Sequence, residues 1–158
     1  MIVFGYPGIG KTTIAKYDYR FIDLDPSDPL IRWRWPWKKD DWVTDYCNMA
    51  LLLSKQGYYV MVSTHPKVIR KLVANGEESY CFVYPDISIQ KEWVNKLKER
   101  YKDYPNRSTH NAYVRARDHF EEDFHQMERL HGNKLVIKSM EYELKKCIVA
   151  IFEGTRGG

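Results

Sequence analysis

The sequence predicts an α/β protein in which helices cover both faces of a parallel sheet. Short apolar runs, as at 1–4, 58–63 and 80–84, alternate along the chain with longer amphipathic stretches. The runs at 58–63 and 80–84 are nearly continuous in apolar character, as strands buried on both faces are. A glycine-rich turn follows the first run directly and opens an amphipathic stretch. Such strand–helix–strand units form right-handed crossovers between parallel strands.

The glycine-rich turn matches the pattern G-x-x-x-x-G-K-[ST]. It reads Gly5-Tyr6-Pro7-Gly8-Ile9-Gly10-Lys11-Thr12, with Thr13 behind it. In this pattern the backbone N–H groups point inward and form a nest for phosphate at a helix N-terminus. We expect Lys11 to reach the β- and γ-phosphates and the Thr12 hydroxyl to hold Mg²⁺. A turn closing a hairpin is the alternative, and it leaves both residues unexplained. The motif predicts a three-layer P-loop NTPase fold that binds ATP and Mg²⁺ through residues 5–13.

The first half of the chain divides at turn residues. We expect a short helix from Lys11 to about Tyr17, then a second strand over 20–25 that stops at a proline. The next helix begins near Asp40 or Asp41 and ends before a glycine at its C′ position. Its apolar stripe is Trp42, Tyr46, Met49, Ala50 and Leu53. The third strand covers 58–63, and a helix with Pro66 in its first turn extends to Asn75-Gly76.

The second half continues the alternation. The fourth strand covers 80–84, and Ser88 is expected to cap a helix with one stripe of Trp93, Leu97 and Tyr101. After a break at Pro105-Asn106, a long helix begins near Ser108, and a fifth strand covers 134–137. A closing helix aligns Leu144, Cys147, Ile148 and Ile151, and residues 153–158 are expected to fray. The expected sheet therefore has five parallel strands, and ligands should bind beyond their carboxyl ends.

Composition limits the class of protein. The 158 residues suit a single domain, 1–158, and the net charge of +4 suits phosphate-bearing ligands without indicating a dedicated nucleic-acid protein. Cys47, Cys81 and Cys147 are widely spaced in apolar surroundings, which favours reduced core thiols over disulfides or a zinc site. No apolar run has transmembrane length. Because the first predicted strand begins at Met1, we expect no signal peptide. We expect a soluble, cytoplasmic protein without a membrane partner. Composition does not predict its oligomeric state.

The layout resembles the small P-loop kinases of the nucleoside monophosphate kinase-like group across essentially the whole chain. Within that group it resembles the compact deoxynucleotide-kinase-like proteins of bacterial viruses. The narrower resemblance rests on three strand ends: Asp23-Leu24-Asp25, Ser63-Thr64-His65 and Tyr84-Pro85-Asp86. It implies a segment at about 26–42 that covers the phosphate acceptor, and a helical lid at about 96–118. The lid of such kinases carries arginines that act on the migrating phosphoryl group.

Basic residues recur along the expected lid. They are Lys96, Lys98, Arg100, Lys102, Arg107, Arg115 and Arg117. Arg107, at the tip, and Arg115 are the best candidates for a catalytic role, and Arg117 is a candidate for substrate binding. The alternative for each of them is a solvated helical face.

The third strand departs from the pattern of the group. It ends in Ser63-Thr64-His65, where an acid usually supports Mg²⁺ through water. Asp23 or Asp25 could take over that support, or one of them could be the general base for an acceptor hydroxyl. A helix or turn cap is the alternative for Asp25, so Asp23 is the stronger candidate. For His65 we favour helix capping over catalysis.

Three tryptophans alternate with cations after the second strand. The segment is Arg32-Trp33-Arg34-Trp35-Pro36-Trp37-Lys38. Trp33 and Trp35 could stack on a base while Arg34 holds its phosphate, although at least one indole should simply pack against the following helix. We therefore predict an ATP-dependent kinase for a small nucleotide, a (deoxy)nucleoside monophosphate. The alternatives are a kinase for a hydroxyl on nucleic acid or a nucleoside, and a non-catalytic nucleotide-binding regulator. Nucleic acid is the less favoured partner, because a long groove needs a larger basic surface.

Overall fold

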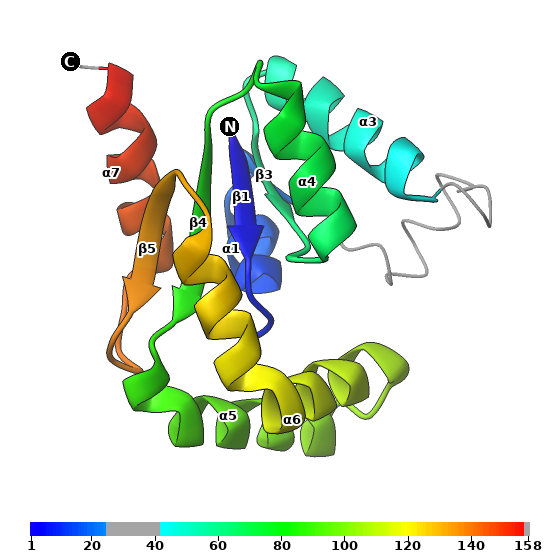
Figure 1. Ribbon diagram of the computed structural model, residues 1–158, viewed down its shortest axis with the longest axis vertical. Coiled ribbons are helices and arrows are strands. Elements are labelled where there is room, and N and C mark those ends of the chain that lie inside the picture. Colours follow the sequence, from blue (N-terminus) through cyan, green and yellow to red (C-terminus); the bar gives the residue numbers. More distant parts are fainter. Residues whose placement is uncertain (25–41, 157–158) are drawn as a thin grey trace.

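A five-stranded parallel sheet forms the centre of the molecule (Figure 1). The structure, a computed structural model, describes residues 1–24 and 42–156. The strands are β1 (Ile2–Gly5), β2 (Phe21–Asp23), β3 (Tyr59–Val62), β4 (Tyr80–Pro85) and β5 (Asn133–Ile137). They lie in the order β2-β3-β1-β4-β5. The pairing places Val3 opposite Met61 on one side and Cys81 on the other, so β1 is the central strand. The predicted fold class is confirmed.

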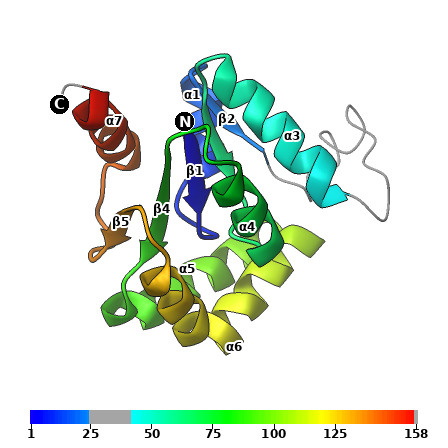
Figure 2. The ribbon, with the colours of Figure 1, turned by 45° about the horizontal axis from the view of Figure 1, so that its top comes forward.

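Helices cover both faces of this sheet and one end of it. The described helices are α1 (Lys11–Tyr17), α3 (Trp42–Lys55), α4 (Pro66–Asn75), α5 (Gln90–Asp103), α6 (Arg107–Arg129) and α7 (Leu144–Arg156). Figures 1 and 2 show α3, α4 and the C-terminal part of α6 on one face, with α1 on the other. An ion pair between Lys145 and Asp18 ties α7 to the end of α1. Helix α5 runs across the carboxyl ends of the strands, beneath the loop that follows β1.

The core explains why the central strands are apolar on both faces. All residues of β1 and β3 are buried, and Phe4 stacks on Phe82 of β4 at 4.9 Å between ring centroids. The helices contribute Tyr46, Trp93 and Ile148, each fully buried. Cys47 and Cys81 are buried free thiols, and burial raises the pKa of both. Among the described residues no helix is long and apolar enough to cross a membrane.

Two local predictions come out differently. Ser88 does not cap α5: it lies inside a 3₁₀ turn at Ile87–Ile89, where the Asp86 side chain accepts a hydrogen bond from its N–H. The C-terminal stretch is not frayed up to its end, because α7 continues to Arg156. The predicted long helix is present as α6, and it is kinked at His119, which has non-helical φ and ψ. The predicted Asp40 or Asp41 cap lies outside the described residues.

Candidate active site

The predicted phosphate loop connects β1 to α1 at the carboxyl edge of the sheet. Gly8 and Gly10 have φ of 93° and 108°, a left-handed conformation that favours glycine. A Cβ on Gly8 would also lie 2.8 Å from Leu97 Cδ2, so α5 packs directly against the loop. The N–H of Tyr6 donates to Val83 O of β4 at 2.9 Å. These contacts hold the loop in one conformation above the start of α1.

The residues expected to bind the phosphates and the metal ion lie close together at this loop. Lys11 Nζ donates to Gly5 O at 3.1 Å, so its ammonium bends back over the loop. The Thr12 hydroxyl donates to Asp23 Oδ2 at 3.0 Å, although the two residues belong to different elements. A hydroxyl and a carboxylate side by side are oxygen donors of the kind that Mg²⁺ prefers. No cluster of three metal-binding side chains occurs within 1–24 and 42–156. The arrangement therefore fits Mg²⁺ held by one hydroxyl, phosphate oxygens and water.

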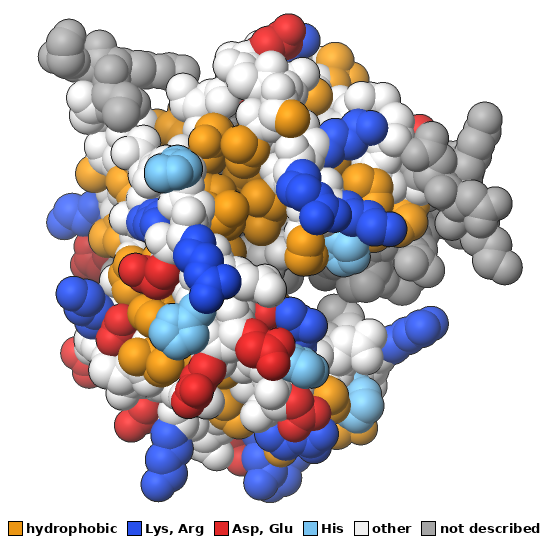
Figure 3. Space-filling model, viewed as in Figure 1, with side chains coloured by type: hydrophobic (Ala, Val, Ile, Leu, Met, Phe, Trp, Pro, Cys, Tyr) orange, Lys and Arg blue, Asp and Glu red, His pale blue; other side chains and the backbone are white. Residues whose placement is uncertain are grey.

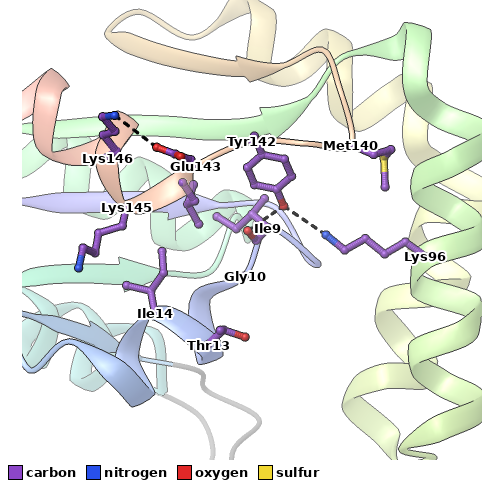
Figure 4. A pocket seen from close by; sticks show the side chains of 11 residues that line it. Ile9, Gly10, Thr13, Ile14, Lys96, Met140, Tyr142, Glu143, Lys145 and Lys146 are labelled. Atoms are coloured by element: carbon purple, nitrogen blue, oxygen red, sulfur yellow. Dashed lines mark hydrogen bonds and ion pairs between the residues drawn. The ribbon is translucent and has the colours of Figure 1, made fainter.

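A pocket opens beside the phosphate loop, between the start of α1 and the β5–α7 connection (Figure 4). Its volume is about 520 Å³, and its lining includes Ile9, Thr13, Lys96, Met140 and Tyr142. Lys96 Nζ donates to Gly8 O at 2.7 Å and to the Tyr142 hydroxyl at 3.2 Å. Burial lowers the pKa of Lys96, with the charge of Arg100 as a second cause, and burial raises that of Tyr142 to about 12. The sequence indicates Lys96 only as a lid cation and gives no signal for Tyr142.

The predicted lid arginines occupy different environments on α6. Arg107, the first residue of the helix, is exposed. Arg115 forms two hydrogen bonds with Asp123, of 2.9 and 2.5 Å, which span the kink at His119. Arg117 is exposed, is paired with the adjacent Asp118, and lies over the Tyr113 ring. Arg115 lies close enough to the loop for its charge to act on Tyr6. Arg117 instead pairs with its neighbour Asp118 at the surface.

Arg115 lies on the side of the site formed by β3 and α4. His65 caps α4 as predicted, because its Nδ1 accepts the N–H of Lys67 at 3.2 Å. Burial lowers the pKa of His65, and so do the charges of Lys67, Arg70 and Arg115. Figure 3 shows Lys and Arg side chains grouped around a histidine on this face, above a hollow. A cluster of positive charges therefore adjoins the carboxyl end of β3.

Tyr6 is a further loop residue on this side. Its hydroxyl is buried and has no hydrogen-bond partner among the described residues. Its ring contacts Phe120 of α6 edge-on, with 5.8 Å between the centroids. Burial raises its pKa, and the charges of Asp123 and Arg115 also act on it. The hydroxyl therefore lies within the field of the Arg115–Asp123 pair.

Four predicted substrate-binding residues lie outside the described residues: Asp25, Trp33, Arg34 and Trp35. The remaining predicted residues divide into two groups. The loop residues and Asp23 are brought together at the carboxyl edge of the sheet, and Arg115 approaches from α6. Arg107 and Arg117 have no described contact with the loop.

The strand order, the glycine-rich loop after β1 and the helical hairpin of α5 and α6 make up the three-layer α/β fold that the sequence predicts. Among solved structures the chain is similar to shikimate kinase from Bacteroides thetaiotaomicron, with a TM-score of 0.53. The identity is 16%, over 96% of this chain and 97% of that one. No protein-family model matches the sequence, and no curated protein matches it. The similarity extends over the whole chain and establishes the fold.

Proposed function

We propose that the protein is an ATP- and Mg²⁺-dependent P-loop kinase. The observation that carries the proposal is the phosphate loop with the Thr12 hydroxyl 3.0 Å from the Asp23 carboxylate. ATP would bind with its phosphates in residues 5–13 and its base toward the pocket beside Ile9 and Tyr142. Mg²⁺ would neutralise charge on the β- and γ-phosphates, with Thr12 as ligand. Asp23 would orient the hydroxyl and the water shell, and Lys11 would stabilise the migrating phosphoryl charge.

For the acceptor we propose a small anionic nucleotide, a (deoxy)nucleoside monophosphate. The cations around His65, namely Lys67, Arg70 and Arg115, support an anion on that side of the loop. A phosphate acceptor is ionised at neutral pH and needs no general base. In that case Asp23 can accept the hydrogen bond from the Thr12 hydroxyl without having to take a proton from the acceptor. The resemblance to viral deoxynucleotide-kinase-like proteins favours deoxynucleotides. Trp33, Trp35 and Arg34 would contact the base and its phosphate.

A kinase for an alcohol is the second candidate. Its support is the similarity in fold to shikimate kinase over 96% of the chain. On this hypothesis a carboxylate must accept the proton of the attacking hydroxyl. Asp23, which ends β2, would be that base, with Asp25 as the alternative.

Turnover assays separate these candidates. Purified protein is mixed with ATP, Mg²⁺ and one acceptor from each of four classes: nucleoside monophosphates, nucleosides, hydroxy acids and 5′-hydroxyl oligonucleotides. For the monophosphate kinase, Asp25→Asn should retain most of the turnover. Asp23→Asn should lose part of it, and added Mg²⁺ should restore some of that loss. For the hydroxyl kinase, Asp23→Asn, or Asp25→Asn if Asp25 is the base, should lower turnover by about a hundredfold, the usual contribution of a positioned base, and added Mg²⁺ should not restore it. ATP binding without turnover of any acceptor would instead indicate a non-catalytic regulator.

A further inference from the structure

Three successive carbonyl oxygens of the phosphate loop each accept a hydrogen bond from a side chain outside the loop. Trp93 Nε1 donates to Pro7 O at 2.9 Å, Lys96 Nζ to Gly8 O at 2.7 Å, and Tyr142 Oη to Ile9 O at 2.8 Å. Trp93 and Lys96 are one turn apart on α5, whereas Tyr142 belongs to the β5–α7 connection. Two segments distant in sequence therefore converge on the outer side of one tripeptide.

Holding these oxygens fixes the peptide planes of the loop. In a trans peptide the carbonyl of one residue and the N–H of the next point in opposite directions. Fixing Pro7 O and Ile9 O from outside therefore turns the N–H groups of Gly8 and Gly10 toward the inside, where a phosphate nest needs them. The N–H of Ile9 lies 3.4 Å from Tyr6 O, a long bond that a phosphate oxygen can replace.

The three donors also support one another. Lys96 Nζ lies 4.5 Å from the centroid of the Trp93 ring and 5.4 Å from that of Tyr142, within the range of cation–π attraction. The Tyr142 hydroxyl accepts from Lys96 while it donates to Ile9 O, so the hydrogen bonds form a chain and polarise each other. The Trp93 and Tyr142 rings stack with 6.1 Å between centroids. Each donor is therefore held in place before a ligand arrives.

We propose that Lys96, Tyr142 and Trp93 are positioning residues that preset the phosphate loop for the polyphosphate of ATP. The proposal rests on the proposed function, because it presumes that this loop binds phosphate. It assigns Lys96 to the floor of the loop rather than to the moving part of the lid. The β5–α7 connection would then act on the phosphates indirectly, because its Tyr142 holds a carbonyl oxygen of the loop. The same residue also lines the pocket. Rigidity present before binding increases affinity, because less freedom is lost on binding.

The test uses the full chain and a probe without a base, magnesium tripolyphosphate, titrated by calorimetry. Tyr142→Phe removes one hydroxyl and no charge, and Lys96→Met keeps the stem over Trp93 but removes the donor. Both should bind tripolyphosphate about fivefold to tenfold more weakly, the effect of one or two net hydrogen bonds. Lys96→Arg keeps a donor and should recover part of the affinity. Lys91→Met and Tyr19→Phe, at exposed positions on α5 and after α1, should bind like the wild type.

Two further measurements distinguish positioning from other roles. Direct attraction by the Lys96 charge would be weakened by high salt and would leave Tyr142→Phe unaffected, whereas positioning predicts a loss for both variants that persists in high salt. A purely structural effect would lower the melting temperature without weakening tripolyphosphate binding. If both variants bind tripolyphosphate like the wild type, or lose only adenosine affinity, the inference is wrong and the kinase proposal stands. If the wild type binds neither tripolyphosphate nor ATP, the proposed function is wrong and the inference with it.

Discussion

Lys11 is half-buried at the start of α1, with its ammonium 3.1 Å from Gly5 O inside the loop. Lys11→Ala removes a cation that acts on charge developing in the transition state, and it deletes no core packing. Turnover should fall by about a hundredfold or more, as when one preorganised transition-state donor is lost. The melting temperature should change little. Steady-state assays and thermal unfolding measure the two effects separately.

A matched control for this change is Lys16→Ala in the same helix, because Lys16 is exposed. It should retain the turnover of the wild type. Full activity in a folded Lys11→Ala protein would contradict the kinase proposal, since no other described residue takes the position of Lys11 in the motif.

Gly8 combines a positive φ with close packing against α5. Its φ is 93°, and a Cβ there would lie 2.8 Å from Leu97 Cδ2 and 3.2 Å from Trp93 Nε1. Gly8→Ala should lower the free energy of unfolding by about 2 kcal/mol or more, through left-handed strain together with overlap. Gly57 has a similar φ of 97° with nothing within 4 Å of its Cβ position, so Gly57→Ala carries the strain alone. Chemical denaturation of both variants isolates the contact between loop and helix. If both variants lose the same free energy of unfolding, α5 shifts to accommodate the methyl group of Gly8→Ala.

At the scale of elements, α6 is two helical segments joined at His119 and bridged by Arg115 and Asp123. The bridge holds Arg115 in the absence of ligand. We expect Arg115→Gln to lower turnover at least tenfold while ATP affinity without acceptor stays near that of the wild type, because lid groups engage when both substrates are bound. Asp123→Asn removes the bridge but keeps the guanidinium, so it should retain far more turnover. Parallel kinetics and ATP-analogue titrations of the two variants test this.

Arg107 provides the second test of the lid. It is exposed at the N-terminus of α6, and Arg107→Ala should reduce turnover only if the tip closes over the phosphates during the reaction. Arg129→Ala, at the exposed far end of the same helix, is the control. If Arg107→Ala, Arg115→Gln and Arg129→Ala all match the wild type, the basic residues of α6 form only a solvated face.

Element types could be predicted from the sequence because apolar periodicity and turn residues report local structure directly. Pro66 and Gly76 give both ends of α4, and the Asn106 side chain caps α6 as the break at Pro105-Asn106 indicates. The predicted Ser88 cap is wrong because Asp86, two residues earlier, caps the preceding 3₁₀ turn and accepts both the N–H and the hydroxyl of Ser88. Which of two neighbouring polar side chains acts as the cap depends on side-chain geometry that a residue pattern does not contain.

At the scale of the whole molecule, the motif predicts the loop between β1 and α1, and the rule that ligands lie beyond the carboxyl ends of parallel strands predicts that the end of β2 lies near it. Thr12 and Asp23 are in contact, and their role at phosphate and metal stays a prediction. The contacts that support the loop could not be predicted. Tyr142 reaches Ile9 across 133 positions and belongs to no recognised pattern. Lys96 reaches Gly8 across 88 positions, and the sequence indicates it only as a lid cation. Convergence of this kind depends on where α5 and the β5–α7 connection lie in space.

Asp18 joins three parts of the molecule and predicts how stability depends on pH. Its carboxylate accepts hydrogen bonds from the backbone and side chain of Arg20, at 2.8 to 3.1 Å, and lies 3.2 Å from Lys145 Nζ. The hydrogen bonds from the Arg20 side chain are the largest cause of the lowered pKa of Asp18. A carboxyl group with a lowered folded-state pKa stabilises the fold above its unfolded pKa of about 3.9, and this stabilisation is lost as pH falls further.

Asp18→Asn should therefore lower the melting temperature at neutral pH and reduce its decline in acid. The neutral amide loses the ionic contacts with Arg20 and with Lys145 of α7 at every pH, so the difference between the wild type and the variant should begin to shrink below about pH 4 and continue to shrink as pH falls. Glu121→Gln, at an exposed position on α6, is the control and should keep the wild-type pH profile. Calorimetric scans from pH 7 down to pH 3 provide the comparison, which covers the unfolded-state pKa. A constant difference between wild type and Asp18→Asn across this range would show that Asp18 acts through packing or neutral hydrogen bonds rather than through its charge.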